Sequence, residues 1–294
     1  MFKAKKSLGQ NFLKSGKIVE KIIDTADLKS GDIVLEVGPG KGLLTEKLLE
    51  KAKKVSAVEK DDRLIGYLQK KFAREIKTGK LELIHNDILD FSTNNLKPQY
   101  QIIANLPYYI TGQFLRKFLS CDFPPSKMVV MLQKEVAQRI TSNLGTRCLS
   151  LKKGGKESIL SLSVKVYGEP KYIATVKAEN FTPRPKVDSA LLLIDNISKR
   201  FFKNINEENF FRLIRAGFSN KRKMLINNLS SKTSTRNLGI GYLSFSKEGL
   251  ADIFEKLEIP LKIRAEDLSL QDWKGLYLEL ENIFKKQKNQ KQFS

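Results

Sequence analysis

The stretch Ile33-Val-Leu-Glu-Val-Gly-Pro-Gly-Lys-Gly42 decides the fold of this 294-residue chain. Its first five residues are a largely apolar run typical of a buried strand, and a glycine-rich turn follows directly. The apolar spacing of Leu43–Lys51 then predicts a helix. In an open parallel sheet, a strand, turn and helix in this order place a ligand site at the carboxyl end of the strand. We therefore expect an α/β fold with a ligand at this turn.

Two phosphate-binding patterns do not fit the glycine turn. The P-loop requires Ser or Thr directly after its Lys, but Lys41 is followed by Gly42. The dinucleotide fingerprint requires Gly-x-Gly-x-x-Gly, and Leu43 stands where its third Gly belongs. The remaining pattern resembles the first motif of Rossmann-like methyltransferases, whose loop wraps the methionine part of S-adenosylmethionine; a structural turn is the alternative. The candidate cofactor-binding residues of this turn are Glu36, Gly38 and Gly40.

Short apolar runs alternate with helical patterns through the first two-thirds of the chain, as in a sheet with helices on both faces. Strand patterns stop after about Asn196, and apolar residues recur at helical spacing from Glu207 to Leu229. We expect a Rossmann-like domain over residues 1–199, with a seven-stranded, mostly parallel sheet, and a small all-α domain over 200–294. The expected strands are Ile33–Val37, Lys54–Val58, Leu81–His85, Gln101–Ala104, Met128–Leu132, Leu160–Val166 and Ala190–Ile194.

Two acids follow the next strands along the chain. Glu59 ends the second strand, where a carboxylate can accept hydrogen bonds from both ribose hydroxyls of a nucleoside. Asp87 follows the third strand, where it can accept the amino group of the cofactor's adenine while Ile88 packs against the ring. The alternatives are that Glu59 is a surface acid at a strand end and that Asp87 is an ordinary turn residue.

The tetrad Asn105-Leu106-Pro107-Tyr108 follows the fourth strand, at the same sheet edge. The lone pair of an exocyclic amine such as adenine N6 is delocalised into the ring, so the amine is a poor nucleophile. The amide oxygen of Asn105 and a backbone carbonyl near Leu106 or Pro107 can accept its two hydrogens and direct the lone pair toward a methyl donor. Tyr108 can stack on the base, which stabilises binding by roughly 1–3 kcal/mol. The tetrad is typical of amino methyltransferases that act on adenine, cytosine or glutamine, and a packed Pro turn is the alternative.

Four segments together resemble the rRNA adenine dimethyltransferases, and within that family the enzymes of the small ribosomal subunit. The resemblance spans roughly residues 4 to 275. It implies S-adenosylmethionine-dependent N6,N6-dimethylation of two adjacent adenosines near the 3′ end of small-subunit (16S) rRNA, in an assembling subunit during ribosome biogenesis. The segments are Lys6–Leu13, Glu36–Gly42, Asn105–Tyr108 and Phe181–Ser189.

The same resemblance implies roles for individual residues. Asn11 and Leu13 help to close the cofactor site, and Phe181 faces Tyr108 across the target base. The residues that it assigns to S-adenosylmethionine are Asn11, Leu13, Gly38, Glu59, Asp87 and Asn105.

The chain departs from the family pattern at two places. Tyr109 stands where the bacterial enzymes usually have Asn, which bears on how the target nucleotide is held. The segment 145–163 is divergent and longer than usual. It either contacts RNA through Lys152, Lys153 and Lys156 or is a solvated excursion, and both interpretations stay open.

The charge predicts a polyanionic partner. The chain carries 53 Lys and Arg against 32 Asp and Glu, a net charge of +21. Residues 200–294 contribute +7 and residues 1–199 contribute +14, so the excess is not a basic tail. Release of counterions from phosphates drives such binding; a generally basic proteome is the alternative.

Composition sets further expectations. Cys121 and Cys148 are too few for a disulfide framework and have no ligand-spaced partners, so we expect a reducing cytoplasm and no metal. We also expect no membrane span, because no apolar run reaches about 18 residues. A secretory signal is not expected, because no apolar region follows the basic start. We expect a monomer.

Two rival functions remain. The first is an antibiotic-resistance methyltransferase that acts on large-subunit rRNA; the longer helical C-terminal region and Lys221–Lys223 favour the small-subunit interpretation. The second is a non-catalytic nucleic-acid-binding transcription factor built on the same fold, against which the intact tetrad argues.

Overall fold

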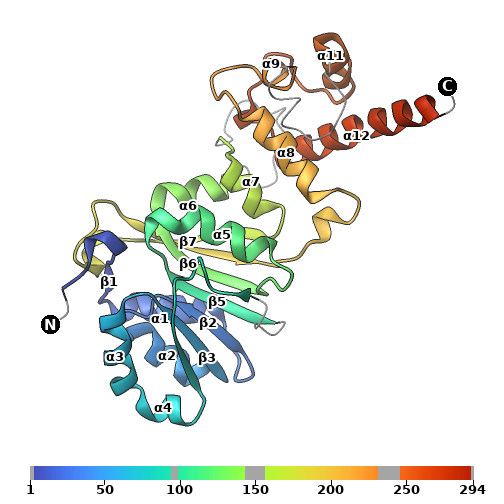
Figure 1. Cartoon of the computed structure of the whole chain (residues 1–294). Helices are drawn as coiled ribbons and strands as arrows, with labels where there is room; N and C mark the ends of the chain where they lie inside the picture. Colours follow the sequence, from blue (N-terminus) through green and yellow to red (C-terminus); the bar gives the residue numbers. More distant parts are fainter. Residues whose placement is uncertain (1–2, 94–98, 143–155, 231–245, 293–294) are drawn as a thin grey trace. The chain divides into compact units, whose positions relative to one another are not determined.

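Figure 1 shows the computed structural model of the chain. The chain divides into two compact units. The first comprises residues 1–138 and 167–198, and the second comprises residues 139–166 and 199–294. The described residues are 3–93, 99–142, 156–230 and 246–292.

The first unit is built on a seven-stranded sheet with the order β4-β3-β2-β5-β6-β9-β7 (Figure 1). Neighbouring strands from β4 to β6 are parallel, whereas β9 is antiparallel to both β6 and β7. The expected mostly parallel sheet of seven strands is therefore confirmed. The strands are β2 (Ile33–Val37), β3 (Lys54–Glu59), β4 (Leu81–His85), β5 (Tyr100–Asn105), β6 (Lys127–Gln133), β7 (Glu169–Val176) and β9 (Ser189–Asp195).

Both faces of this sheet are covered. Successive side chains of a strand point to opposite faces, and the neighbours Val34 and Leu35 of β2 are both buried. On one face, Val34 packs in a core with Ile22 of α1, Leu48 of α2 and Leu64 of α3. Burial on both sides explains why the strands are continuous apolar runs rather than alternating ones. The helices of this part of the chain are α1 (Gly16–Ala26), α2 (Leu43–Lys51), α3 (Asp62–Lys71), α4 (Ala73–Lys77), α5 (Thr111–Ser120) and α6 (Lys134–Thr141).

One expected strand is wrong. Residues Leu160–Val166 alternate apolar and polar side chains like a strand, but Ile159–Lys165 form helix α7. Ser158 starts the helix, because its hydroxyl accepts the Ser161 N–H at 3.1 Å and its own N–H donates to the Ser161 hydroxyl at 2.7 Å. The seventh strand is β7 instead. It contains Pro170, which lacks an N–H, and it lies at the sheet edge, where a Pro is tolerated.

A second, two-stranded sheet joins parts of the first unit that are distant in sequence. Strand β1 (Phe12–Leu13) pairs antiparallel with β8 (Phe181–Thr182), with Leu13 opposite Phe181. In Figure 1 the dark blue N-terminal segment accordingly runs beside the yellow segment that carries β8. The N-terminal motif and the Phe181 segment of the sequence are thereby brought together.

The second unit is all-α in its described residues, as expected for the C-terminal region. Phe218 stacks on the fully buried Trp273, with ring centroids 6.0 Å apart. Trp273 also packs so closely on Gly217 that no side chain fits there. The α-helices of this unit after α7 are α8 (Glu207–Gly217), α9 (Leu225–Leu229), α11 (Lys247–Lys256) and α12 (Leu270–Gln292).

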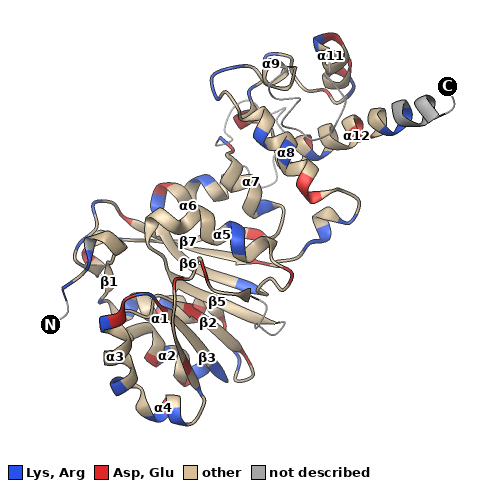
Figure 2. Ribbon diagram, viewed as in Figure 1, with Lys and Arg blue, Asp and Glu red and all other residues tan. Residues whose placement is uncertain are grey.

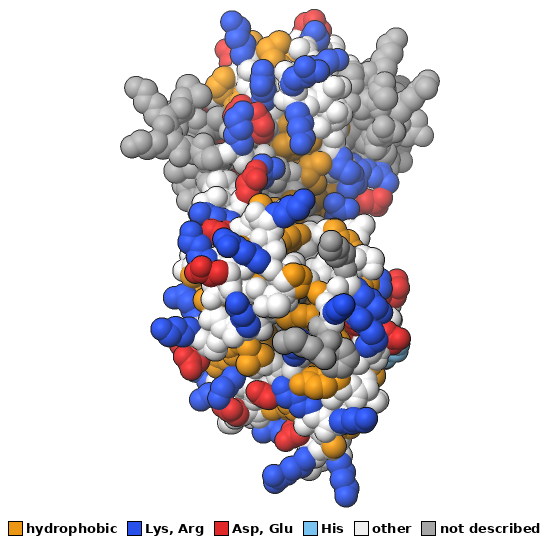
Figure 3. All heavy atoms as spheres, turned by 90° about the vertical axis from the view of Figure 1, so that its left-hand side faces the viewer, with side chains coloured by type: hydrophobic (Ala, Val, Ile, Leu, Met, Phe, Trp, Pro, Cys, Tyr) orange, Lys and Arg blue, Asp and Glu red, His pale blue; other side chains and the backbone are white. Residues whose placement is uncertain are grey.

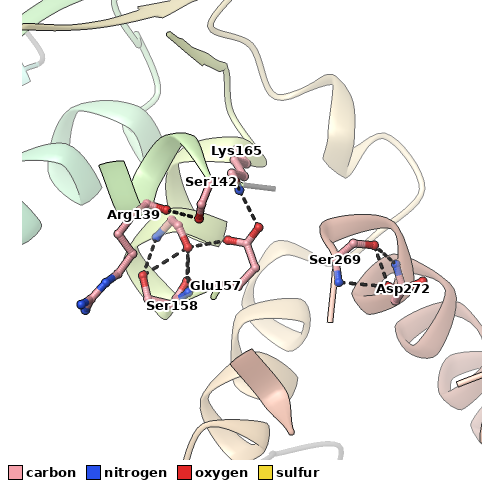
Figure 4. Close-up of polar contacts among 8 residues, drawn as sticks. Arg139, Ser142, Glu157, Ser158, Lys165, Ser269 and Asp272 are labelled. Atoms are coloured by element: carbon pink, nitrogen blue, oxygen red, sulfur yellow. Dashed lines mark hydrogen bonds and ion pairs between the residues drawn. The ribbon is translucent and has the colours of Figure 1, made fainter. Parts of the chain in front are cut away.

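Residues 139–166 group with the second unit, whereas the expected boundary at 199/200 places them in the first domain, and a buried polar network lies within this segment. Glu157 accepts a hydrogen bond from the Lys165 ammonium at 2.5 Å, and Lys165 also donates to the Ser142 carbonyl (Figure 4). The backbone N–H of Glu157 donates to the carbonyl of Glu266 at 2.7 Å, which ties this segment to the helical unit. Ser269 and Asp272 cap α12 through a reciprocal pair of hydrogen bonds (Figure 4).

The divergent segment is only partly described. Lys152, Lys153 and Cys148 lie outside the described residues, and Lys156 forms an ion pair with Glu266. Within the described residues no helix is both long and apolar enough to cross a bilayer. The same part of the chain contains no group of three or more His, Cys, Asp or Glu side chains placed to hold a metal ion.

Candidate active site

A pocket opens at the carboxyl ends of the parallel strands in the first unit. The space between its walls, including space open to solvent, is about 810 Å³. Leu13 and Glu36, although expected at the site, do not line it. The expected residues that do line the pocket are Asn11, Gly38, Gly40, Glu59, Asp87, Ile88, Asn105, Leu106, Pro107, Tyr108 and Phe181. The other lining residues are Leu8, Gly9, Gln10, Phe12, Val37, Val58, Lys60, Asn86, Tyr109 and Ile110.

The glycine turn forms one wall and is braced by Glu59. Gly38 and Gly40 have φ values of +68° and +58°, a backbone region that glycine adopts without strain. One carboxylate oxygen of Glu59 accepts the Gly40 N–H at 3.2 Å, and the other accepts the Asp61 N–H at 2.9 Å. Burial raises the pKa of Glu59, and these backbone hydrogen bonds oppose that effect. Glu59 therefore shapes the turn as well as facing the pocket.

Glu36 lies behind the turn and not in the pocket wall. Its side chain is 1% exposed, and neither carboxylate oxygen has a hydrogen-bond partner among the described residues. Burial raises the pKa of Glu36 to about 8, so the group is mostly a neutral acid at pH 7. The Thr45 hydroxyl acts against this shift, and the nearby Glu59 carboxylate adds to it.

Asp87 is already held on both of its oxygens. One accepts the Lys60 ammonium at 2.5 Å, and the other accepts the Leu89 N–H at 2.9 Å. Burial acts to raise the pKa of Asp87, but these two hydrogen bonds outweigh it, so the pKa lies below its ordinary value. A carboxylate oxygen has more than one lone-pair site, so Asp87 can still accept a further donor from the pocket.

The Asn105 amide is oriented by the N-terminal segment. Its nitrogen donates to the backbone carbonyl of Asn11 at 3.1 Å, which leaves the amide oxygen as the acceptor available to a ligand. The Pro107 carbonyl is used by the Ile110 N–H, whereas the Leu106 carbonyl accepts no hydrogen bond from the described residues. Of the two carbonyls considered from the sequence, that of Leu106 is therefore the available one.

Two aromatic side chains complete the pocket. The Tyr108 hydroxyl forms a hydrogen bond of 2.8 Å with the Ser189 hydroxyl, which fixes the direction of its ring. Phe181 is buried, and the pairing of β8 with β1 holds it in place. These two aromatics come from segments more than 70 residues apart in the chain.

The contacts that hold the N-terminal segment on Asp61 were not predicted from the sequence. The Asp61 side chain is 0% exposed; it accepts Gln10 Nε2 at 2.8 Å and lies 3.2 Å from the Lys5 ammonium. Arg63 binds the same carboxylate with both Nε and Nη2, and this is the main reason that the pKa of Asp61 lies far below its ordinary range. The segment that orients Asn105 is thus anchored beside the acid Glu59. The only sequence feature that points to these contacts is an acidic residue at the start of α3.

Basic side chains occur in both units of the part of the chain that the structure describes. Lys and Arg occur on helices and loops of both units (Figure 2) and are scattered among hydrophobic and acidic side chains on the face shown in Figure 3. In the segment after β8, Arg184 and Lys186 are exposed and have no acidic partner among the described residues.

Comparisons with known proteins agree with this geometry. A family model described as ribosomal RNA adenine dimethylase matches residues 1–245. A protein named ribosomal RNA small subunit methyltransferase A from Dehalococcoides mccartyi is 42% identical over 280 residues, which are 94% of this chain and 88% of that protein. A protein of the same name from Fusobacterium nucleatum is 36% identical over 286 residues, or 96% of this chain and 98% of that protein.

Solved structures resemble the chain over most of its length. A dimethyladenosine transferase from Plasmodium falciparum has a TM-score of 0.75 and 30% identity, covering 92% of this chain and 98% of that one. The 23S rRNA methyltransferase ErmE has a TM-score of 0.70 at 22% identity, covering 92% of this chain and 100% of that one. The second likeness shows a shared fold alone.

Proposed function

The chain belongs to the ribosomal RNA adenine dimethylase family, and from this premise we propose that it dimethylates N6 of two adjacent adenosines near the 3′ end of small-subunit (16S) rRNA. It is an S-adenosylmethionine-dependent rRNA methyltransferase, and we propose that its substrate is a small subunit in the course of assembly. Relatives named for the small subunit match nearly the whole chain, which supports this choice. We further propose that it acts as a monomer in the cytoplasm.

The pocket residues fit S-adenosylmethionine. Bound there, the cofactor would supply an activated methyl group on a sulfonium. The backbone at Gly38 and Gly40 lets a ligand approach closely, which suits the methionine part. Glu59 would accept the ribose hydroxyls, and Asp87 would accept the adenine amino group beside Ile88. Asn11, Leu13 and Glu36 would act as supports: Asn11 through its carbonyl, Leu13 through its place opposite Phe181, and Glu36 from behind the turn.

The orientation of Asn105 is the observation that carries the proposal. Because its nitrogen is committed to Asn11, its oxygen is free to accept one hydrogen of the target amine. The Leu106 carbonyl accepts the other, so the nitrogen lone pair turns out of the ring plane toward the cofactor side of the pocket. Fixed acceptors of this kind act without reorganisation at the moment of reaction. Tyr108 and Phe181 hold the extruded base by stacking.

A methyl-transfer assay with three acceptors tests the substrate. Purified protein and S-adenosylmethionine labelled in the methyl group are incubated with undermethylated small subunits, with large-subunit RNA, or without RNA. We expect label in the small subunits alone. Label in large-subunit RNA would support the alternative of a large-subunit rRNA methyltransferase. The absence of label in both RNAs would support the alternative of a non-catalytic nucleic-acid-binding protein.

The variant Asn105→Ala tests the mechanism. We expect transfer to be lost while affinity for small subunits falls little, because Asn105 acts on the target amine. The control Asn209→Ala lies in α8 of the second unit, outside the pocket, and should retain full transfer. Turnover by Asn105→Ala close to that of the unaltered protein would rule out this role for the amide.

A further inference from the structure

Tyr109 is an exposed aromatic residue at the rim of the pocket. It is 61% exposed, more than any other large hydrophobic side chain of the described residues, and it lines the pocket together with Lys60. Its neighbours in the turn point elsewhere: the Tyr108 ring is fixed by Ser189, and Ile110 is buried. The turn thus places Tyr108 in the pocket wall and Tyr109, largely exposed, at the pocket rim.

The ring of Tyr109 rests on the backbone of Gly9. Gly9 has a φ of +60°, and a Cβ built on it would lie 3.2 Å from Cε1 and 3.3 Å from Cδ1 of the ring. No side chain therefore separates the ring from the N-terminal segment, and Pro107 borders the same place. The segment beneath is itself fastened, because Gln10 donates to the buried Asp61. One side of the ring is supported, and most of its remaining surface faces solvent.

Such a ring is suited to a nucleobase. Single-stranded RNA bases stack on aromatic side chains, and a ring that is supported on one side loses less freedom on binding than an unsupported one. A nucleotide next to an extruded adenosine remains tied to it by one phosphodiester and must lie near the pocket rim. Lys60 also lines the pocket, where its ammonium is paired with the Asp87 carboxylate.

We propose that Tyr109 is a substrate-binding residue that stacks on the nucleotide adjacent to the target adenosine. The inference rests on the proposed function and deepens it. The enzyme then holds two consecutive nucleotides, one in the pocket and one on the Tyr109 ring. Because any base can stack on the ring, Tyr109 contributes to affinity and to the positioning of the RNA rather than to base specificity.

Steady-state methylation of undermethylated small subunits tests the proposal with Tyr109→Phe, Tyr109→Asn and Tyr109→Ala. We expect Asn and Ala to raise KM roughly 5- to 140-fold, the range that corresponds to the loss of one stacked base. We expect kcat to stay within about threefold and Tyr109→Phe to retain the unaltered KM, because the ring and not the hydroxyl makes the contact. The slope of affinity against salt should not change, since stacking releases no counterions.

Two controls separate this proposal from its alternatives. Tyr67→Asn removes another exposed tyrosine of the same unit that lies outside the pocket, and its KM should be unaltered. Affinity for S-adenosylhomocysteine, measured by calorimetry, should stay within about twofold in every Tyr109 variant. An unaltered KM in Tyr109→Asn and Tyr109→Ala, or a loss of cofactor affinity in them, would overturn the proposal while leaving the function intact. Failure of the unaltered protein to methylate small subunits would instead contradict the proposed function.

Discussion

Alanine substitution at Gly42 and Gly38 separates folding from cofactor binding within one turn. Both residues have a left-handed backbone, in which an alanine is strained by about 1–2 kcal/mol. At Gly42 a Cβ would also meet the Phe72 ring at 2.6 and 2.8 Å, and Phe72 is buried. Overpacking of this kind destabilises by about 1–3 kcal/mol. We therefore expect Gly42→Ala to lower the free energy of unfolding by roughly 2–5 kcal/mol.

Gly38→Ala should behave differently. The nearest heavy atom to a Cβ at this position is the Asn105 carbonyl oxygen at 3.7 Å, an ordinary contact, so only the backbone strain of about 1–2 kcal/mol applies. Gly38 lines the pocket and Gly42 does not. A methyl group at Gly38 stands where the cofactor approaches the backbone, and we expect affinity for S-adenosylhomocysteine to fall at least tenfold.

Urea denaturation followed by circular dichroism measures the first effect, and calorimetric titration of the folded variants with S-adenosylhomocysteine measures the second. We expect Gly42→Ala, where folded, to bind within about threefold of the unaltered protein. If Gly38→Ala binds the cofactor normally, the turn does not contact it. If Gly42→Ala is no less stable than Gly38→Ala, the packing argument at Phe72 is wrong.

Three further outcomes are expected. Asp61→Asn should speed amide hydrogen exchange in residues 5–13, and equal exchange at pH 7 would refute the anchor. Because the pKa of Asp61 is depressed in the folded protein, the stabilisation by its carboxylate is complete at neutral pH and is lost only as the pH falls through that low pKa. Glu59→Gln should weaken S-adenosylhomocysteine binding about tenfold, because one amide oxygen cannot serve two backbone N–H groups and the ribose, and unaltered affinity would move the ribose contact elsewhere. Replacing Arg184 and Lys186 together by Ala should reduce the slope of log affinity against log salt by about 1.4, at about 0.7 for each lost phosphate contact; an unchanged slope would exclude both from the RNA interface.

The parallel part of the sheet and the pocket residues at the carboxyl ends of its strands could be predicted because both follow from local sequence. Each parallel strand is a short apolar run, and the carboxyl ends of such strands meet at one edge of the sheet. Residues directly after those runs, such as Gly38, Glu59, Asp87 and Asn105, therefore had to lie together, and all four line the pocket.

Contacts between segments that are far apart in the chain could not be predicted from the sequence. Nothing local indicates that the Asn11 carbonyl orients an amide 94 residues away, or that Leu13 pairs with Phe181. The buried position of Asp61 depends on the same folding of the N-terminal segment. The alternating pattern of Leu160–Val166 suggested a strand. The segment is a helix because Ser158 caps it and because it packs in the helical unit.

Identification of the modified nucleoside bears most directly on the catalytic role of this pocket. Undermethylated small subunits are incubated with the protein and methyl-labelled S-adenosylmethionine, their RNA is digested to nucleosides, and the products are separated by mass spectrometry. We expect the label in N6,N6-dimethyladenosine, and we expect fragments from a parallel digestion with a base-specific ribonuclease to place it at two adjacent positions near the 3′ end. Label on a ring carbon, on a ribose or on cytosine would contradict a pocket in which Asn105 and Leu106 grip the adenine amine.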